Sequence, residues 1–409
     1  MADVAGFQLP PPPRRMRDLY GPQLGRGTLR AAEREVEALD PEHPPPHFDL
    51  TYADTRRFPP PQWVLPSFNA AASGGGMTYT PNRGDRAVRR QVATNLTDFL
   101  GSTIDPDADL ILTPGTQAGL FSALSALVEG GDTVVIFDPD YMTTERTLHY
   151  LGASVRHVPI RWTEGAGQVD LPALEAIARE KPKLLVFSHP NNPTGAVFEP
   201  ATIERIADIV RRYNLLVLVD ELYCRLLYDQ HPFVHLATLE GMRKRSVTLL
   251  GPSKTESMSG YRVGVAVAPP PIIDRMEDVL SVSALRAPAY AQHTLTRWLA
   301  DDRAYVATRV ADYQRLRDRA ATLLGSSKHL EPYRPNGTAY MFPAITGITA
   351  SDQAIALEIR RLGVTINPGY QFGPGGNRHI RICFAQDGPA LGEAIGRITQ
   401  ALEAAARLR

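Results

Sequence analysis

From Leu110 onwards, short apolar runs alternate with longer amphipathic stretches, and no other feature of this 409-residue sequence constrains the fold so strongly. Short runs with few polar side chains are typical of strands that are buried on both faces. The expected strands are 110–113, 133–137, 183–187, 215–219, 246–250 and 262–268, and the expected helices are 116–128, 142–151 and 200–213. This alternation predicts an α/β fold, in which a mainly parallel sheet is covered by helices on both faces.

The C-terminal part has a different pattern. A long helix is expected over 304–324, followed by a strand over 339–342, a helix over 351–362 and a strand over 379–384. A last helix places one set of apolar residues on a single face: Leu391, Ala394, Ile395, Ile398 and Leu402. These elements predict a smaller α+β domain.

Three parts of the chain are therefore expected. Residues 1–46, rich in Pro, Arg and Glu with one expected helix over 27–39, form an N-terminal arm. Residues 79–300 form the large domain. Residues 47–78 and 301–409 form the small domain.

The composition excludes several classes of protein. The 44 basic and 44 acidic side chains balance, which argues against nucleic-acid binding and against attachment to a membrane surface. No apolar run approaches the roughly 18–20 residues that span a bilayer, and residues 1–15 lack the apolar core of a secretory signal. The two cysteines, Cys224 and Cys383, have no metal-ligand spacing, so we expect no metal site and a reduced, cytoplasmic setting.

One lysine has neighbours that suggest chemistry. Lys254 follows Ser253 and precedes Gly260-Tyr261-Arg262, after the expected strand 246–250. This arrangement suits a lysine that forms a Schiff base with an aldehyde, while serine and arginine hold the phosphate of the same molecule. The cofactor that it suggests is pyridoxal 5′-phosphate (PLP).

Other polar residues follow the ends of expected strands, where ligands gather in open α/β sheets. Gly115, Thr116 and Gln117 open a helix whose free N–H groups suit a phosphate, although an ordinary strand–helix turn explains them too. Asn192 lies in a Pro- and Gly-rich turn, where it either donates to a phenolate or serves the backbone.

Two further strand ends carry residues of the same kind. Asp220 ends a buried strand, so its charge needs a partner such as a protonated pyridine nitrogen; a helix cap is the alternative. Tyr223 is close enough in sequence to reach the ring oxygen of the same molecule. Tyr141 either stacks on an aromatic ring or is an ordinary core or surface tyrosine.

The ordered set of these motifs resembles the class I and II aminotransferases, which are fold-type I PLP enzymes. The resemblance runs from about Phe48 to the C-terminus and includes Tyr79, Pro368-Gly369, Phe372-Gly373 and Arg381. It implies an aspartate-aminotransferase-like fold, with a seven-stranded type of sheet in the large domain. It also implies a homodimer that acts on small-molecule amino acids and keto acids.

The resemblance further implies a role for each site residue. Lys254 forms the Schiff base and then acts as general base, and Asp220 holds the ring nitrogen protonated. Tyr223 and Asn192 bond the ring oxygen, and Tyr141 stacks on the ring. Arg381 binds the substrate α-carboxylate as a bidentate pair. The phosphate ligands are Gly115, Thr116, Gln117, Ser253 and Arg262, together with Tyr79 from a second subunit.

The chain departs from the family pattern near the substrate. The segment from Tyr52 to Arg57 lacks the usual glycine, so Tyr52, Asp54 or Arg56 are candidates for the pocket. Glu256 stands where an aromatic residue is usual. Arg286 is either a ligand for an anionic or polar substrate tail, donated across the dimer, or a surface or interface arginine.

These departures leave alternatives to transamination. Another PLP-dependent reaction of an amino acid, such as β- or γ-elimination, replacement, cyclisation or oxidation, uses the same cofactor residues. A PLP-sensing transcription regulator needs a basic DNA-binding module, and residues 1–46 are too short and proline-rich for a helix-turn-helix. The sequence names neither the amino donor nor the acceptor.

Overall fold

The computed structural model describes residues 11, 13–17, 19, 48–52, 57–162 and 166–407. The helix predicted over 27–39 lies outside these residues, as do Asp54 and Arg56. The described part of the arm contains the short helix α1 (Arg14–Arg17), where Arg15 lies over the ring of Tyr150 at 5.6 Å. This contact places α1 against helix α6 (Met142–Leu151).

A mainly parallel sheet forms the centre of the large part. Among the described residues it has nine strands in the order β2-β10-β9-β8-β6-β3-β4-β5-β7. Their bounds are β2 (Leu110–Thr113), β10 (Gly264–Val267), β9 (Ser246–Leu250), β8 (Leu216–Asp220), β6 (Leu184–Ser188), β3 (Thr133–Asp138), β4 (Ser154–Arg161), β5 (Ala166–Val169) and β7 (Val197–Phe198). Seven strands, from β2 to β4, correspond to the expected type of sheet, and the short β5 and β7 extend it. β10 pairs antiparallel with both β2 and β9.

Helices cover both faces of this sheet because its strands are apolar on both faces. Val134 and Ile136 of β3 pack with α5 (Thr116–Leu127), α6 and α9 (Pro270–Val282). Val135 and Phe137 point the other way and pack with α7 (Leu171–Ala178) and α8 (Pro200–Arg212). Further along that face, β2 and β10 pack with α3 (Val64–Ser73), α4 (Arg86–Leu100) and α10 (Ala289–Gln292). The α/β fold predicted from the sequence is confirmed.

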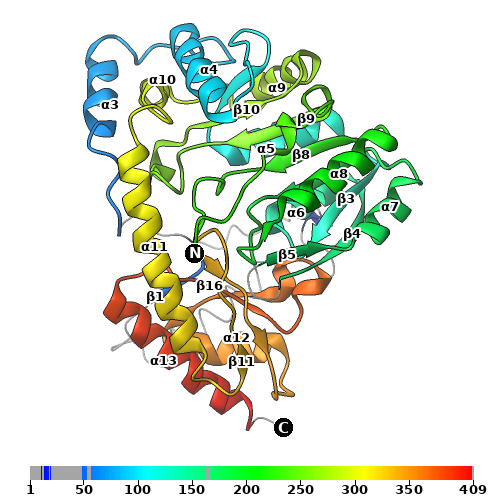
Figure 1. Cartoon of the computed structure of the whole chain (residues 1–409), viewed down its shortest axis with the longest axis vertical. Helices are drawn as coiled ribbons and strands as arrows, with labels where there is room; N and C mark the ends of the chain where they lie inside the picture. The colour runs from blue at the N-terminus through cyan, green and yellow to red at the C-terminus, as the bar shows by residue number, and fades with distance from the viewer. Residues whose placement is uncertain are drawn as a thin grey trace, which may run out of the picture.

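The smaller part is built around the long helix α11 (Arg303–Leu324), which runs down to it from the large sheet (Figure 1). Buried residues of α11 pack with α12 (Asp352–Arg361) and α13 (Gly388–Ala405). Three short sheets accompany these helices. They are β12 (Tyr340–Met341), β16 (Ile380–Cys383) and β15 (Asn367–Pro368); β11 (Leu330–Glu331) and β13 (Ala344–Ile345); and β1 (Phe48–Asp49) with β14 (Val364–Thr365).

The hydrophobic clusters show which segments pack together. Leu50 and Phe58 belong to the cluster of α11, α12 and α13, whereas Trp63 and Val64 belong to the cluster of α3, α4 and α10. The domain bounds 1–46, 47–78 with 301–409, and 79–300 stay a prediction.

Two features relevant to function are absent from the described residues. None of their helices is long and apolar enough to cross a bilayer. Within the same ranges, no group of three or more His, Cys, Asp or Glu side chains is arranged to hold a metal ion.

Candidate active site

The fold brings one end of several sheet strands to a single cavity of about 390 Å³. Loops that follow the carboxyl ends of β2, β3, β6, β8 and β9 contribute side chains to it. β10 runs in the opposite direction, so Arg262, which precedes this strand, lies at the same edge of the sheet as those loops. The cavity is lined by Thr51, Tyr52, Thr116, Gln117, Leu120, Tyr141, Met142, Thr143, Ser188, Asn192, Asp220, Leu222, Tyr223, Ser253, Lys254, Ser259, Arg262, Tyr340, Asn367 and Arg381.

One end of the cavity is an anion-binding arrangement. Gly115 is the N-cap of α5 at φ 76°, and no side chain caps the helix, so its first N–H groups face the cavity. A Cβ atom on Gly115 would lie 2.4 Å from Nη2 of Arg262, so only glycine leaves room for this guanidinium. The Oγ of Ser253 is buried and, in the part of the chain that is described, has no hydrogen-bond partner. A helix N-terminus, a guanidinium and an unsatisfied hydroxyl together suit a phosphate.

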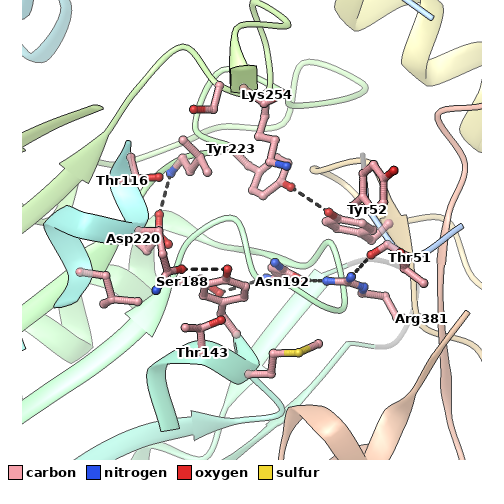
Figure 2. Close-up of a pocket in the computed structure, with 18 of the residues that line it drawn as sticks. Thr51, Tyr52, Thr116, Thr143, Ser188, Asn192, Asp220, Tyr223, Lys254 and Arg381 are labelled. Atoms are coloured by element: carbon pink, nitrogen blue, oxygen red, sulfur yellow. Dashed lines mark hydrogen bonds between the residues drawn. The ribbon is translucent and has the colours of Figure 1, made fainter. Parts of the chain in front are cut away.

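Asp220 ends β8 and lies on the opposite side from Arg381 in Figure 2. Its Oδ1 accepts a hydrogen bond from the backbone N–H of Leu222 at 3.1 Å. Burial is the largest effect on Asp220, and with the charge of Glu221 it raises the pKa to about 6 against the lowering effects of the Leu222 N–H and of Lys254. A carboxylate in such a place gains most from a cationic partner.

Hydroxyl groups and an amide lie between these two sides. The Tyr223 hydroxyl donates to the Tyr340 hydroxyl at 3.2 Å, and burial raises the pKa of Tyr223 well above its usual value. The Tyr141 hydroxyl donates to Oε1 of Gln117 at 3.0 Å. Asn192 uses its Oδ1 to accept from Arg381 at 2.8 Å, which leaves its NH2 group as a donor.

Lys254 extends into the middle of this set (Figure 2). Within the described ranges, its ammonium group makes no hydrogen bond or ion pair. An amine that lines a cavity without a fixed partner is available to a ligand.

Arg381 of β16 is a buried cation whose neighbours are all neutral. Its Nη1 donates to Asn192 at 2.8 Å, and its Nη2 donates to Oδ1 of Asn367 at 2.6 Å and to the carbonyl of Thr51. The guanidinium carbon lies 4.1 Å from the ring centre of Tyr340 and 4.7 Å from that of Phe372. Among the described residues Arg381 forms no ion pair with a carboxylate, and its buried Nε–H has no acceptor. A buried, unpaired guanidinium at a cavity wall calls for an anionic ligand.

Most of the predicted site residues line this cavity, with three exceptions. Gly115 borders it as the cap of α5. Tyr79 and Arg286 do not line it; Arg286 stacks over the Tyr79 ring at 4.5 Å and donates to the carbonyl of Thr80 at 2.5 Å. Glu256, singled out as a departure from the pattern, points away from the cavity into a buried ion cluster with Arg225.

Sequence reasoning did not single out several lining residues. Thr51, Tyr340 and Asn367 come from the smaller part, and Asn367 directly precedes the Pro368-Gly369 pair that was noticed. Ser188 ends β6 and donates to Asp140 at 2.8 Å. Their positions next to strand ends are the sequence feature that could have identified them.

Comparisons with known proteins agree with this geometry. The sequence profile described as aminotransferase class I and II matches residues 49–398. The chain belongs to this family. An arginine–pyruvate transaminase from Pseudomonas aeruginosa is 31% identical over 326 residues, which cover 79% of this chain and 82% of that protein. An aromatic-amino-acid aminotransferase from Thermococcus litoralis is 29% identical over 350 residues, which cover 85% of this chain and 89% of that protein.

Solved structures give the same answer. The crystal structure of an aspartate aminotransferase from Rhodobacter sphaeroides has a TM-score of 0.85 and 32% identity, covering 93% of this chain and all of that chain. This member of the class I and II aminotransferases is therefore a PLP-dependent transferase, which moves an amino group from an α-amino acid to a keto acid.

The residues of the cavity fit PLP. The unsatisfied Ser253 hydroxyl, the Arg262 guanidinium and the uncapped helix α5 match the phosphate. Asp220, with its raised pKa, matches a pyridinium nitrogen. Lys254 supplies the amine that PLP enzymes require.

Proposed function

We propose that Lys254 carries the reaction of this aminotransferase and that Arg381 selects α-carboxylates. The observation that carries the proposal is that the guanidinium of Arg381, which has no carboxylate partner among the described residues, shares a cavity with an unpaired lysine and a half-buried aspartate. Bound PLP supplies an aldehyde for the amino group and a ring that withdraws electrons from the substrate Cα.

The phosphate end holds the cofactor in place. In this proposal the N–H groups of Thr116 and Gln117 and the side chains of Ser253 and Arg262 bind the phosphate, and Gly115 keeps the space open. Tyr141 stacks on the ring. These contacts would fix the ring relative to the sheet edge and would keep Asp220 beside the ring nitrogen.

The ring end controls protons. The Asp220 carboxylate holds a proton on the ring nitrogen, and that proton relieves the cost of burying the charge. With PLP bound, the Tyr223 hydroxyl would donate to the ring oxygen instead of to Tyr340, and the NH2 group of Asn192 would donate to the same oxygen. Nζ of Lys254 would take the proton from the substrate Cα and would deliver it to the cofactor carbon that receives the amino group.

The substrate end orients the amino acid. Arg381 binds the α-carboxylate, which adds a charge-assisted pair to a guanidinium whose hydrogen-bond partners are otherwise neutral. Tyr52, exposed by 44% and lining the cavity beside Thr51, lies where a substrate side chain enters. The residues at this mouth of the cavity therefore select the amino donor and acceptor.

A homodimer is part of the proposal. Tyr79 is 83% exposed and lies under Arg286, and Met77 and Leu65 are exposed apolar residues of the same region. Exposed aromatic and apolar groups with an arginine are typical of an interface. In the dimer Tyr79 reaches the partner's phosphate end, and Arg286 reaches an anionic or polar substrate tail.

The cellular setting is also proposed. Cys224 and Cys383 are both buried and form no disulfide. Unpaired cysteines support a reducing cytoplasm.

Borohydride reduction and peptide mapping test the central assignment. After reduction of the protein with bound PLP, we expect the pyridoxyl group on Lys254. A Lys254→Ala variant should bind PLP without covalent attachment. Attachment at another lysine in the wild-type protein would refute the assignment.

Single-turnover spectra separate transamination from the alternatives. Mixing the enzyme with an amino acid should convert its cofactor to pyridoxamine phosphate and release a keto acid. Release of a side-chain fragment without pyridoxamine phosphate would indicate elimination or replacement instead.

A further inference from the structure

A buried ion cluster includes a residue of the turn that carries Lys254. Glu256 is fully buried two residues after the lysine, and its Oε1 accepts from Nη1 of Arg225. Arg225 also donates to both carboxylate oxygens of Asp302, at 2.9 and 2.7 Å. One guanidinium therefore holds two carboxylates that are far apart in sequence.

This cluster connects three segments of the fold. Glu256 belongs to the turn after β9 that carries Lys254, and Arg225 belongs to the turn after β8 that carries Tyr223. Asp302 is the N-cap residue of α11. Two of the three segments thus place residues in the cavity.

The turn around Lys254 has weak backbone support. Its two backbone hydrogen bonds, from Ser257 to Lys254 and from Met258 to Pro252, are both 3.3 Å long. Typical bonds of this kind measure about 2.9–3.0 Å. Ser257 also has φ 55°, a backbone conformation that residues other than glycine rarely adopt. The position of the turn therefore depends on side-chain anchors.

Stability alone does not account for a carboxylate at position 256. Burial is the largest effect on the pKa of Glu256, and together with the charge of Asp302 it raises that pKa to about 7 against the lowering effect of Arg225. Oε2 of Glu256 is buried and, among the described residues, lacks a hydrogen bond. An apolar side chain of the same length avoids this cost and leaves the pair of Arg225 and Asp302 intact.

We propose that Glu256 is a positioning residue, which holds the turn of Lys254 at a fixed distance from Tyr223 through its hydrogen bond with Arg225. The inference rests on the proposed role of Lys254. Positioning matters because displacement of a reacting group by about 1 Å can slow a reaction by about 100-fold.

The test compares two substitutions at Glu256 with the same two at Glu277. Glu277 is a control with the same contact pattern at a more exposed position, because its Oε2 accepts from Nε of Arg83 at 2.5 Å and Arg83 also pairs with Asp274, away from the cavity. Glu256→Met keeps the volume and removes the acceptor, whereas Glu256→Gln keeps an oxygen for Arg225. Each variant is measured for kcat, KM, PLP affinity, unfolding temperature, and the rate of borohydride-trapped attachment at saturating PLP.

Glu256→Met should lower kcat and the attachment rate by about 10- to 100-fold, with KM and PLP affinity within about threefold of wild type. Glu256→Gln should recover most of the loss, and the Glu277 variants should behave as wild type. A normal kcat in Glu256→Met, an equal loss in Glu256→Gln, or an equal loss in the Glu277 variants overturns the inference.

Two further measurements keep the test decisive. Where Glu256→Met does not fold, Arg225→Lys replaces it, because lysine cannot hold both carboxylates in the same geometry; a normal kcat then overturns the inference. Mapping of the wild-type attachment site separates the two proposals. Attachment away from Lys254 refutes the proposed function itself, whereas attachment at Lys254 with normal Glu256 variants refutes only the positioning role.

Discussion

Replacing Arg381 by lysine or methionine tests how the cavity recognises an α-carboxylate. A bidentate pair contributes two charge-assisted hydrogen bonds, each worth about 1.5–3 kcal/mol. Lysine keeps the charge and one bond, so kcat/KM should fall by about 10- to 150-fold. Methionine removes both bonds, and the loss should reach about 10² to 10⁴-fold.

The same replacements change the protein without substrate. Oδ1 of Asn192, Oδ1 of Asn367 and the carbonyl of Thr51 all lose their donor when Arg381 becomes methionine. Unsatisfied buried acceptors cost about 1–3 kcal/mol each. Thermal unfolding of the PLP-bound variants therefore has to accompany the kinetics, so that only folded enzyme is compared.

The decisive assay uses two substrates that differ only in the carboxylate. Each variant is mixed with an amino acid and, separately, with the amine left when its carboxylate is removed, and the rate of cofactor conversion is followed by absorbance. Wild-type enzyme should prefer the amino acid, and Arg381→Met should lose that preference. If the substitution slows both substrates by the same factor, Arg381 does not bind the carboxylate and the reasoning fails.

Four other outcomes follow from the site. Ser253→Ala should leave the apoprotein as stable as wild type, because the hydroxyl has no partner there, while titration shows PLP affinity lower by about tenfold. For Asp220, burial raises the pKa from 3.8 to about 6 in the folded protein. Protonated Asp220 therefore contributes its full share to the free energy of unfolding below pH 3.8, and this share is lost as the pH rises through about 6. Urea unfolding of apo Asp220→Asn should show a gain of about 3 kcal/mol near pH 8 and almost none near pH 4. Gly115→Ala should weaken PLP binding by at least about tenfold, since its Cβ meets Arg262 and its φ of 76° is strained. Tyr79→Phe should weaken PLP binding only in the dimer, which sedimentation and titration together reveal; equal weakening in a monomer would contradict the interface.

The large sheet could be predicted because its strands are buried on both faces. That burial makes each strand a continuous apolar run, as in β8 and β9. A short apolar run without alternation, bounded by turn residues, strongly indicates a buried strand. β4 was not predicted. Its residues alternate between exposed and buried positions, and Arg156 and His157 interrupt the apolar run.

The direction of β10 could not be derived from its sequence. The expected strand 262–268 is apolar in either direction, and only pairing with β2 and β9 makes it antiparallel. This direction has a consequence for the site. Arg262, which precedes the strand, comes to the same edge as residues that follow the parallel strands.

Side-chain direction in irregular turns was also beyond the sequence. Glu256 was noticed as a departure near the substrate, yet its carboxylate points to Arg225 and Asp302 rather than into the cavity. Turns have no fixed period, so neighbours in sequence can face opposite sides. The long-range partners of such a residue become visible only when the fold is known.

The position of Arg381 shows how the two parts of the chain share one site. Its strand, β16, belongs to the smaller part, and so do its acceptors Thr51 and Asn367. Its third acceptor, Asn192, comes from the loop after β6 in the large sheet. Since the NH2 group of the same amide remains free to donate, Asn192 joins the ring end of the cavity to the carboxylate end. The bond between Asn192 and Arg381 therefore joins the two parts at the site, together with the bond between the hydroxyls of Tyr223 and Tyr340, and it explains why a motif in the large sheet and an arginine almost 200 residues later belong to a single recognition unit.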